Sequence, residues 1–245
     1  GQPAIAQRLE REARRRGPSP HADATDAWLA ALAGQATAEQ LLESLSDAVD
    51  RAPDSVALRF ARAGQLRALG RTQEALDDLE AVLASRPEDL RARLLHARTL
   101  AAVGRFEDAR REFDALLASR LAFTEAQVWA DAAVTSAALG DFETAADKMT
   151  RFLAASPQSD REWALLAQIY SRSGDDEEEQ RALRNAKTAR RNRLLEAHRE
   201  ARIAAAFGAT ATSIGMLRRI VSQHPDYAAA RRDLQSLEAG RRIEW

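Results

Sequence analysis

The sequence contains no cysteine among its 245 residues, which excludes disulfide bonds and thiolate metal sites. It has no run of about 18 apolar residues, so no stretch predicts a membrane-spanning helix, and no secretory signal peptide is visible. Because the sequence begins at Gly1 rather than Met, an upstream signal, lipid anchor or transmembrane helix stays an alternative. Cytoplasmic and periplasmic locations both fit this composition.

The motifs of common catalytic sites are also missing. The sequence has no phosphate-binding loop of the form GxxxxGK[ST], no GxSxG, no HExxH and no kinase motif. The four histidines, at positions 21, 96, 198 and 224, lack the spacing of metal ligands. We therefore expect a protein that is not an enzyme and that holds no cofactor and no metal.

The charges are balanced, with 36 basic and 37 acidic residues and a net charge of −1. This balance argues against a nucleic-acid partner. All basic residues except Lys148 and Lys187 are arginines. A GC-rich bacterial genome explains that bias, and so does recognition of carboxylates, which arginine binds in a bidentate manner.

Glycines and prolines recur at an almost constant spacing. Gly70, Gly104, Gly140, Gly174 and Gly208 are 34, 36, 34 and 34 residues apart. The prolines that mark the ends of the units are Pro53, Pro87, Pro157 and Pro225. A period of this length indicates stacked helix pairs, with the glycine at the turn inside each pair and the proline after its second helix. No stretch alternates as a strand does, so we expect no sheet.

The repeated unit resembles the tetratricopeptide repeat. One unit shows it in Ala63, Leu66, Gly70, Ala75, Leu79 and Pro87, and another in Trp163, Leu166, Ala167, Tyr170 and Gly174. The resemblance implies an all-α fold: a right-handed α-solenoid of about six stacked helix-turn-helix units with a C-terminal capping helix. The expected segments are a basic helix and linker over 1–21, a degenerate unit over 22–53, five units over 54–226, and a capping helix and tail over 227–245.

Two stretches depart from the repeat. No Gly or Pro separates Asp175 from Phe207, so the turn expected near Arg191 and Asn192 rests on the period alone, and one continuous helix is the alternative. Two extra residues lie near 121–123, where they either bend the stack or lengthen a loop. The acidic run 175–179 is expected in the first turn of a helix, with Glu177 pairing to Arg181.

Several element boundaries are also predicted. A basic helix is expected over 3–16, a linker over 17–25, and a first helix pair over 26–33 and 37–51. Capping boxes are expected at Thr37 with Gln40, Thr124 with Gln127, and Ser159 with Glu162. In the last helix, 226–239, Ala228, Leu234 and Leu237 should cover the end of the stack, while Asp233 and the arginines face water and the tail 240–245 frays.

The resemblance further implies that the first helix of each unit lines a concave groove. The groove residues expected here are Phe60, Arg67, Arg91, Leu94, Arg98, Gln127, Val134, Arg161, Gln168, Arg172, His198 and Arg202. Small apolar residues and arginines prevail in this set, so we expect an extended or helical peptide with acidic residues or a terminal carboxylate. The alternative is that these arginines only keep the groove soluble. A more acidic convex face, with Asp77, Asp78 and Glu80, should balance the groove.

We therefore expect a non-catalytic scaffold or adaptor that binds a protein or peptide partner. One alternative is the docking or regulatory region of a larger enzyme, such as a transferase, whose catalytic domain lies outside this sequence. A third is a scaffold that assembles with copies of itself.

Overall fold

The computed structural model describes residues 19–119 and 125–243. In these ranges every regular element is a helix, and the fold is an all-α helical-repeat solenoid. The chain divides into two compact units, unit 1 up to Ala145 and unit 2 from Ala146. The predicted helix 3–16, the extra residues 121–123, the cap at Thr124 and the last two residues of the tail lie outside the described residues.

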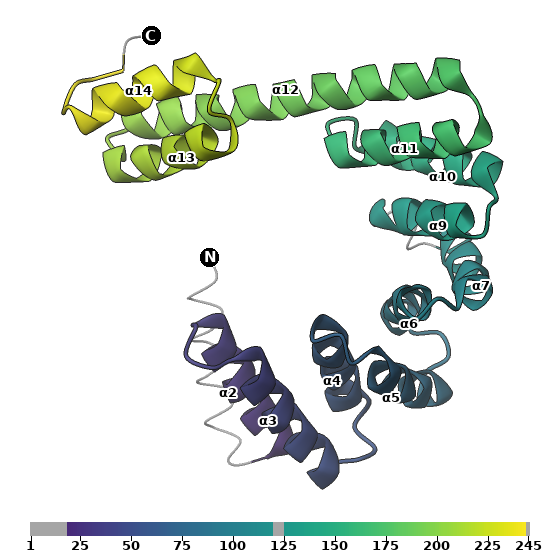
Figure 1. The fold of residues 1–245 in the computed structure, drawn as a ribbon. Coiled ribbons are helices and arrows are strands. Elements are labelled where there is room, and N and C mark those ends of the chain that lie inside the picture. Colours follow the sequence, from purple (N-terminus) through teal and green to yellow (C-terminus); the bar gives the residue numbers. More distant parts are fainter. Residues whose placement is uncertain (1–18, 120–124, 244–245) are drawn as a thin grey trace. The chain divides into compact units, whose positions relative to one another are not determined.

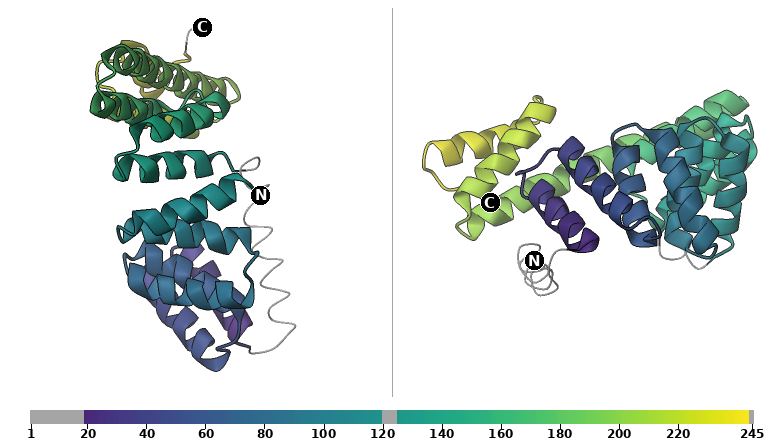
Figure 2. Two further views of the ribbon diagram at one scale, coloured as in Figure 1. Left: turned by 90° about the vertical axis from the view of Figure 1, so that its right-hand side faces the viewer. Right: turned by 90° about the horizontal axis from the view of Figure 1, so that it is seen from below.

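Unit 1 consists of antiparallel helix pairs (Figures 1 and 2). Its helices are α2 Pro20–Leu32, α3 Ala38–Arg51, α4 Val56–Ala68, α5 Thr72–Ser85, α6 Leu90–Ala102, α7 Phe106–Leu117 and α9 Gln127–Ala138. We call the first helix of a pair helix A and the second helix B. Helix α10, Phe142–Ala155, runs from unit 1 into unit 2, which continues with α11 Asp160–Ser173, α12 Asp176–Ala206, α13 Thr210–Gln223 and α14 Ala228–Glu238.

The predicted turn glycines adopt the left-handed conformation, as at Gly70, where φ is 76°. There the Gly70 N–H donates to the Arg67 carbonyl at 3.1 Å and the Arg71 N–H to the Leu66 carbonyl at 2.9 Å. A residue with a side chain would be strained at this φ. Gly34 has the same conformation, with φ of 71°, so the degenerate first pair turns as the others do.

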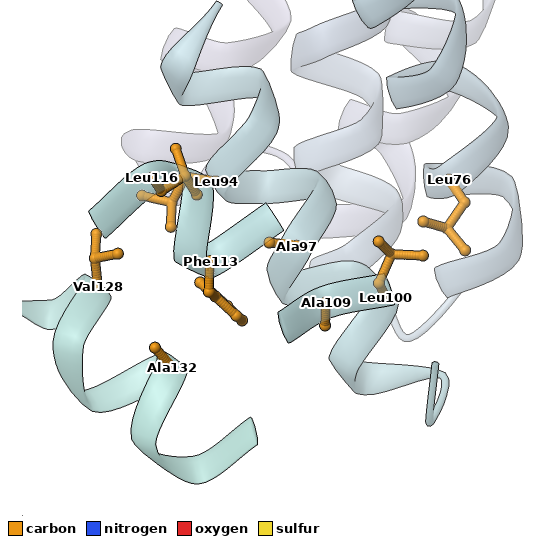
Figure 3. Close-up of a cluster of buried hydrophobic side chains, with 9 residues drawn as sticks. All are labelled: Leu76, Leu94, Ala97, Leu100, Ala109, Phe113, Leu116, Val128 and Ala132. Atoms are coloured by element: carbon orange, nitrogen blue, oxygen red, sulfur yellow. The ribbon is translucent and has the colours of Figure 1, made fainter. Parts of the chain in front are cut away.

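The core of unit 1 lies where consecutive pairs meet. Figure 3 shows Leu76 of α5, Leu94, Ala97 and Leu100 of α6, Ala109, Phe113 and Leu116 of α7, and Val128 and Ala132 of α9 directed toward one another. Phe113 is almost fully buried in this cluster. Each helix B is therefore covered both by its own helix A and by the next helix A along the chain.

A side chain of helix A repeatedly ties back to the loop before it. Arg59, Arg93 and Trp163 donate from a side-chain nitrogen to the carbonyl six residues earlier, that of Pro53, Pro87 and Pro157, at 2.7, 2.7 and 2.9 Å. Arg231 makes the same bond to the Pro225 carbonyl. The pattern Pro-x5-Arg or Pro-x5-Trp is visible in the sequence and indicates how each helix A is fixed to the preceding unit.

The turn predicted near Arg191 and Asn192 is wrong, because α12 is one continuous helix of 31 residues. The cause lies in the repeat register. Pro87, Pro157 and Pro225 each lie 17 residues after a turn glycine, and Arg191 holds that place after Gly174. Arginine favours a helix, whereas proline ends one. Helix B of one pair and helix A of the next are therefore fused.

The start of the described chain also differs from the prediction. Helix α2 begins at Pro20, so residues 20–25 are helical and not part of a linker. The Ser19 hydroxyl accepts from the Ala22 N–H at 3.2 Å, and proline at the first helical position needs no hydrogen bond from its nitrogen. A serine cap followed by proline therefore outweighs the linker-like composition.

The predicted caps have mixed outcomes. The capping box of Thr37 and Gln40 is confirmed, with both reciprocal bonds present. Ser159 lies at the N-cap of α11 but makes no capping bond through its side chain, so that prediction is wrong. The acidic run does occupy the first turn of α12, after Asp175, which accepts from the Glu178 N–H. Arg181 pairs with Glu178 at 2.9 Å rather than with Glu177.

The C-terminal helix covers the last pair with different residues than predicted. Ala230 and Leu237 are buried against Leu217 and Ile220 of α13, whereas Ala228 is exposed. Ile243 of the tail is also buried in this cluster, so the tail is packed at least to this residue. The tail therefore continues the apolar surface that closes the last pair.

Candidate functional site

We define the helix-A face of unit 1 as the residues that lie 13, 10, 6, 3 and 2 positions before each turn glycine, which is the register of the predicted groove. The large exposed apolar side chains of the described part of unit 1 are Trp28, Leu32 and Val134, and all three belong to this face. Trp28 is 51% exposed and Leu32 65%. The neighbouring pairs place Gly64, Ala68, Ala102 and Ala138 at the same positions. Large apolar groups thus lie at two ends of a face otherwise built of small residues.

Trp28 and Leu32 were not among the predicted groove residues. The signal that locates them is Gly34, which precedes Gly70 by 36 residues and adopts the same turn conformation. Counting back from it puts Trp28 and Leu32 in register with Val134 and Ala138 of α9. The first pair therefore contributes to the face despite its poor match to the repeat.

The predicted groove residues of unit 1 fall into three groups. Arg67, Arg91 and Gln127 are exposed, and neither arginine has an acidic partner in the described ranges. Phe60 is half-buried against the core. Leu94 is buried between Leu116 and Val128, so a bound peptide cannot reach it.

Arg98 and Arg202 are not free cations, because each pairs with an aspartate of the next helix A. Arg98 Nε lies 2.6 Å from Asp131 Oδ2, and Arg202 Nε lies 3.6 Å from Asp233 Oδ2. Both arginines lie six residues before a turn glycine, so the same contact is made in two places. The prediction that Asp233 faces water is therefore wrong. These two arginines join consecutive helices.

His198 is buried, so it too is withdrawn from the predicted groove. Its Nε2 lies 2.9 Å from Asp233 Oδ2, and its Nδ1 lies 3.0 Å from the Tyr227 hydroxyl. Burial raises the pKa of the Tyr227 phenol, with the charge of Asp233 adding to the effect. The protonated phenol donates to Nδ1, and Nε2 then donates to the aspartate. This network fixes α14 on the second half of α12.

The remaining predicted groove residues lie on α11 of unit 2. Arg161, Gln168 and Arg172 are all exposed, and Arg172 takes part in an interaction within the chain. These residues hold the helix-A register that α4, α6 and α9 show in unit 1.

The predicted acidic convex face is wrong for Asp78, which is only 2% exposed. Arg62 donates to its two oxygens from Nε and an Nη nitrogen, both at 2.7 Å, and Arg59 donates at 3.1 Å. The hydrogen bonds to Asp78 raise the pKa of the Arg62 guanidinium. The carboxylate is thus the buried centre of a link between α4 and α5.

Comparison with known proteins identifies the repeat. Residues 66–130 match the family model described as tetratricopeptide repeat. The chain carries tetratricopeptide repeats. A comparison with curated proteins finds no match. Within the described residues, no helix is both long and apolar enough to cross a membrane, and no group of three or more His, Cys, Asp or Glu side chains is placed to hold a metal ion.

Solved structures of proteins named MamA share the fold of this tetratricopeptide-repeat chain. MamA from Desulfovibrio magneticus RS-1 is 15% identical, covers 77% of this chain and 95% of its own, and gives a TM-score of 0.60. Another MamA structure is 12% identical, with 67% and 94% covered and a TM-score of 0.60. MamA AMB-1 is 19% identical, with 68% and 95% covered and a TM-score of 0.58. The shared repeat fold suggests a scaffold for protein–protein interaction.

Proposed function

We propose that this protein is a scaffold whose helix-A face in unit 1 binds a segment of a partner protein that carries both apolar and acidic residues. The observation that carries the proposal is the placement of Trp28, Leu32 and Val134. Soluble proteins seldom gather their exposed large apolar residues on one face without a partner for it. Aromatic and aliphatic anchors of this kind are typical of binding sites.

The charge of the same face indicates the complementary chemistry of the partner. Arg67 and Arg91 are exposed there and have no acidic partner in the residues that the structure describes. Asp131 is the acidic residue nearest to the face, and Arg98 neutralises it. Guanidinium groups without partners favour carboxylates, so an Asp or Glu side chain or a terminal carboxylate suits the segment between the apolar anchors.

The test compares two charge-reversal variants of equal charge as baits for partners from cell lysate. We expect Arg67→Glu/Arg91→Glu to lose partners that the parent chain retains, with recovery reduced about tenfold or more. Arg86→Glu/Arg219→Glu is the matched control, because both arginines are exposed and lie on helix B or at its end. Equal recovery by the two variants would overturn the charge part of the proposal.

A second pair of variants tests the apolar part. Trp28→Ser/Leu32→Ser should reduce recovery of the same partners, while Phe207→Ser, which removes a side chain that is 88% exposed in unit 2, should not. Circular dichroism should be unchanged in both variants because the altered side chains are exposed. Full recovery with Trp28→Ser/Leu32→Ser would show that the α2 end of the face is not used.

A further inference from the structure

The first half of α12 exposes a position that is buried in the other helices B. Leu79, Phe113, Met149 and Leu217 each lie nine residues after a turn glycine and are 0–1% exposed. Leu183 holds this position in α12 and is 43% exposed. Four positions further on, Leu83, Leu117, Leu153 and Val221 are replaced by the exposed Lys187. The face that is covered in the other pairs is uncovered here.

The fusion of two helices explains this exposure. Helix α6 packs on α5, α9 on α7, and α14 on α13, so each helix B is covered by the next helix A along the chain. In α12 the next helix A continues along the same axis and cannot fold back. Figure 1 shows α11 beside the first half of α12, and α13 and α14 beside its second half.

The uncovered face is also strongly basic. Residues 180–195 contain six cations and no acidic residue. Arg181 and Arg193 pair with Glu178 and Asp160. The other four, Arg184, Lys187, Arg190 and Arg191, are exposed and have no acidic partner among the described residues. At about 100° per residue, these four side chains and Leu183 lie on one side of the helix, opposite the buried Ala182 and Ala189.

We propose that this side of α12 is a docking site for an amphipathic, acidic helix of a partner protein. We call it the α12 face and define it as Leu183, Arg184, Lys187, Arg190 and Arg191. A helix is the expected occupant because the equivalent surface of α5, α7 and α13 is covered by a helix. The occupant is acidic because four unpaired cations surround the single apolar anchor. This site is separate from the helix-A face of unit 1.

The test uses a defined probe and the full chain. The probe is a fluorescein-labelled, 18-residue synthetic helix with leucines along one face and glutamates along its flanks. Control peptides replace every glutamate by lysine, or insert a proline at the centre. We expect saturable binding of the acidic helix in fluorescence anisotropy, weakened by salt, and at least tenfold weaker binding of both controls. Hydrogen exchange at residues 180–195 should slow when the acidic helix binds.

Variants of exposed residues then locate the site. Leu183→Gln and Lys187→Glu/Arg191→Glu should each weaken binding at least tenfold, and Arg67→Glu/Arg91→Glu should leave it unchanged. Undiminished binding to both α12 variants would overturn the proposal. A loss with the charge variant alone would also overturn it, because it would indicate a purely electrostatic site such as nucleic acids or anionic membranes use. Loss with Arg67→Glu/Arg91→Glu alone would assign the helix to unit 1 instead.

Discussion

Helix α5 and the first half of α12 hold the same place in the repeat, but the chain takes a different course after each of them. After α5, Pro87 ends the helix region and the chain folds back as α6, which packs against α5. After the same number of residues α12 carries Arg191 and continues as a helix. One residue type at one register position therefore separates a covered helix B from a half-covered one. In this fold, burial depends on where the chain turns as much as on the apolar pattern.

The largest effect is expected from truncating the shared apolar position. Leu79→Ala should lower the free energy of unfolding by about 2–5 kcal/mol, because it leaves a cavity in a fully buried site. Leu183→Ala removes the same atoms from a half-exposed site and should cost less than about 1 kcal/mol. Urea denaturation followed by circular dichroism measures both. Equal losses would contradict the view that the α12 face is uncovered.

A proline at the register position would break the difference between the two helices. Arg191→Pro should cost about 3 kcal/mol or more and lower the helical signal, because proline removes a hydrogen bond and clashes within α12. Pro87→Ala in the loop after α5 should change the free energy of unfolding by about 1 kcal/mol or less. Thermal and urea unfolding compare the two. An Arg191→Pro variant with unchanged helicity would show that α12 already bends there.

The buried ion pair belongs to α5 and has no counterpart in α12. Asp78→Ala should cost about 2 kcal/mol, less than for a fully enclosed pair because Arg59 and Arg62 keep part of their hydration. The equivalent residue of α12 is Ala182, which is buried and needs no partner. A double-mutant cycle of Asp78→Ala with Arg62→Ala isolates the interaction. Additive effects would mean that the pair contributes no coupling.

The smallest expected effect concerns a cap in each unit. Thr37→Ala should cost about 1 kcal/mol, since it removes one bond of a complete capping box in unit 1. Ser159→Ala in unit 2 should have almost no effect, because the Ser159 hydroxyl makes no capping bond. Urea midpoints of the two variants, compared with the parent chain, measure the difference. A similar loss for both would mean that Ser159 caps α11 in solution.

The repeat and its turn glycines could be predicted from the sequence because Gly70 and its equivalents have no other inexpensive route to a positive φ. The length of α12 stayed undecided, since the absence of Gly and Pro permits a long helix without requiring it. The predicted groove was less accurate because a register identifies positions and not partners. Whether Arg98 finds Asp131, or His198 finds Tyr227 and Asp233, depends on how neighbouring helices approach each other. Trp28 and Leu32 were missed because a weak match to the repeat concealed their register.

The continuous helix α12 also has a consequence for cooperativity of folding. In a stack of helix pairs, each pair is held to the next by a shared interface, and this coupling makes the stack unfold together. Helix α12 has 31 residues and is about 46 Å long, with α11 packed on its first half and α13 and α14 on its second. Between these halves the coupling is carried by helical hydrogen bonds rather than by a packed interface. The helices α13 and α14, with the half of α12 that they cover, should therefore melt as a separate cooperative block.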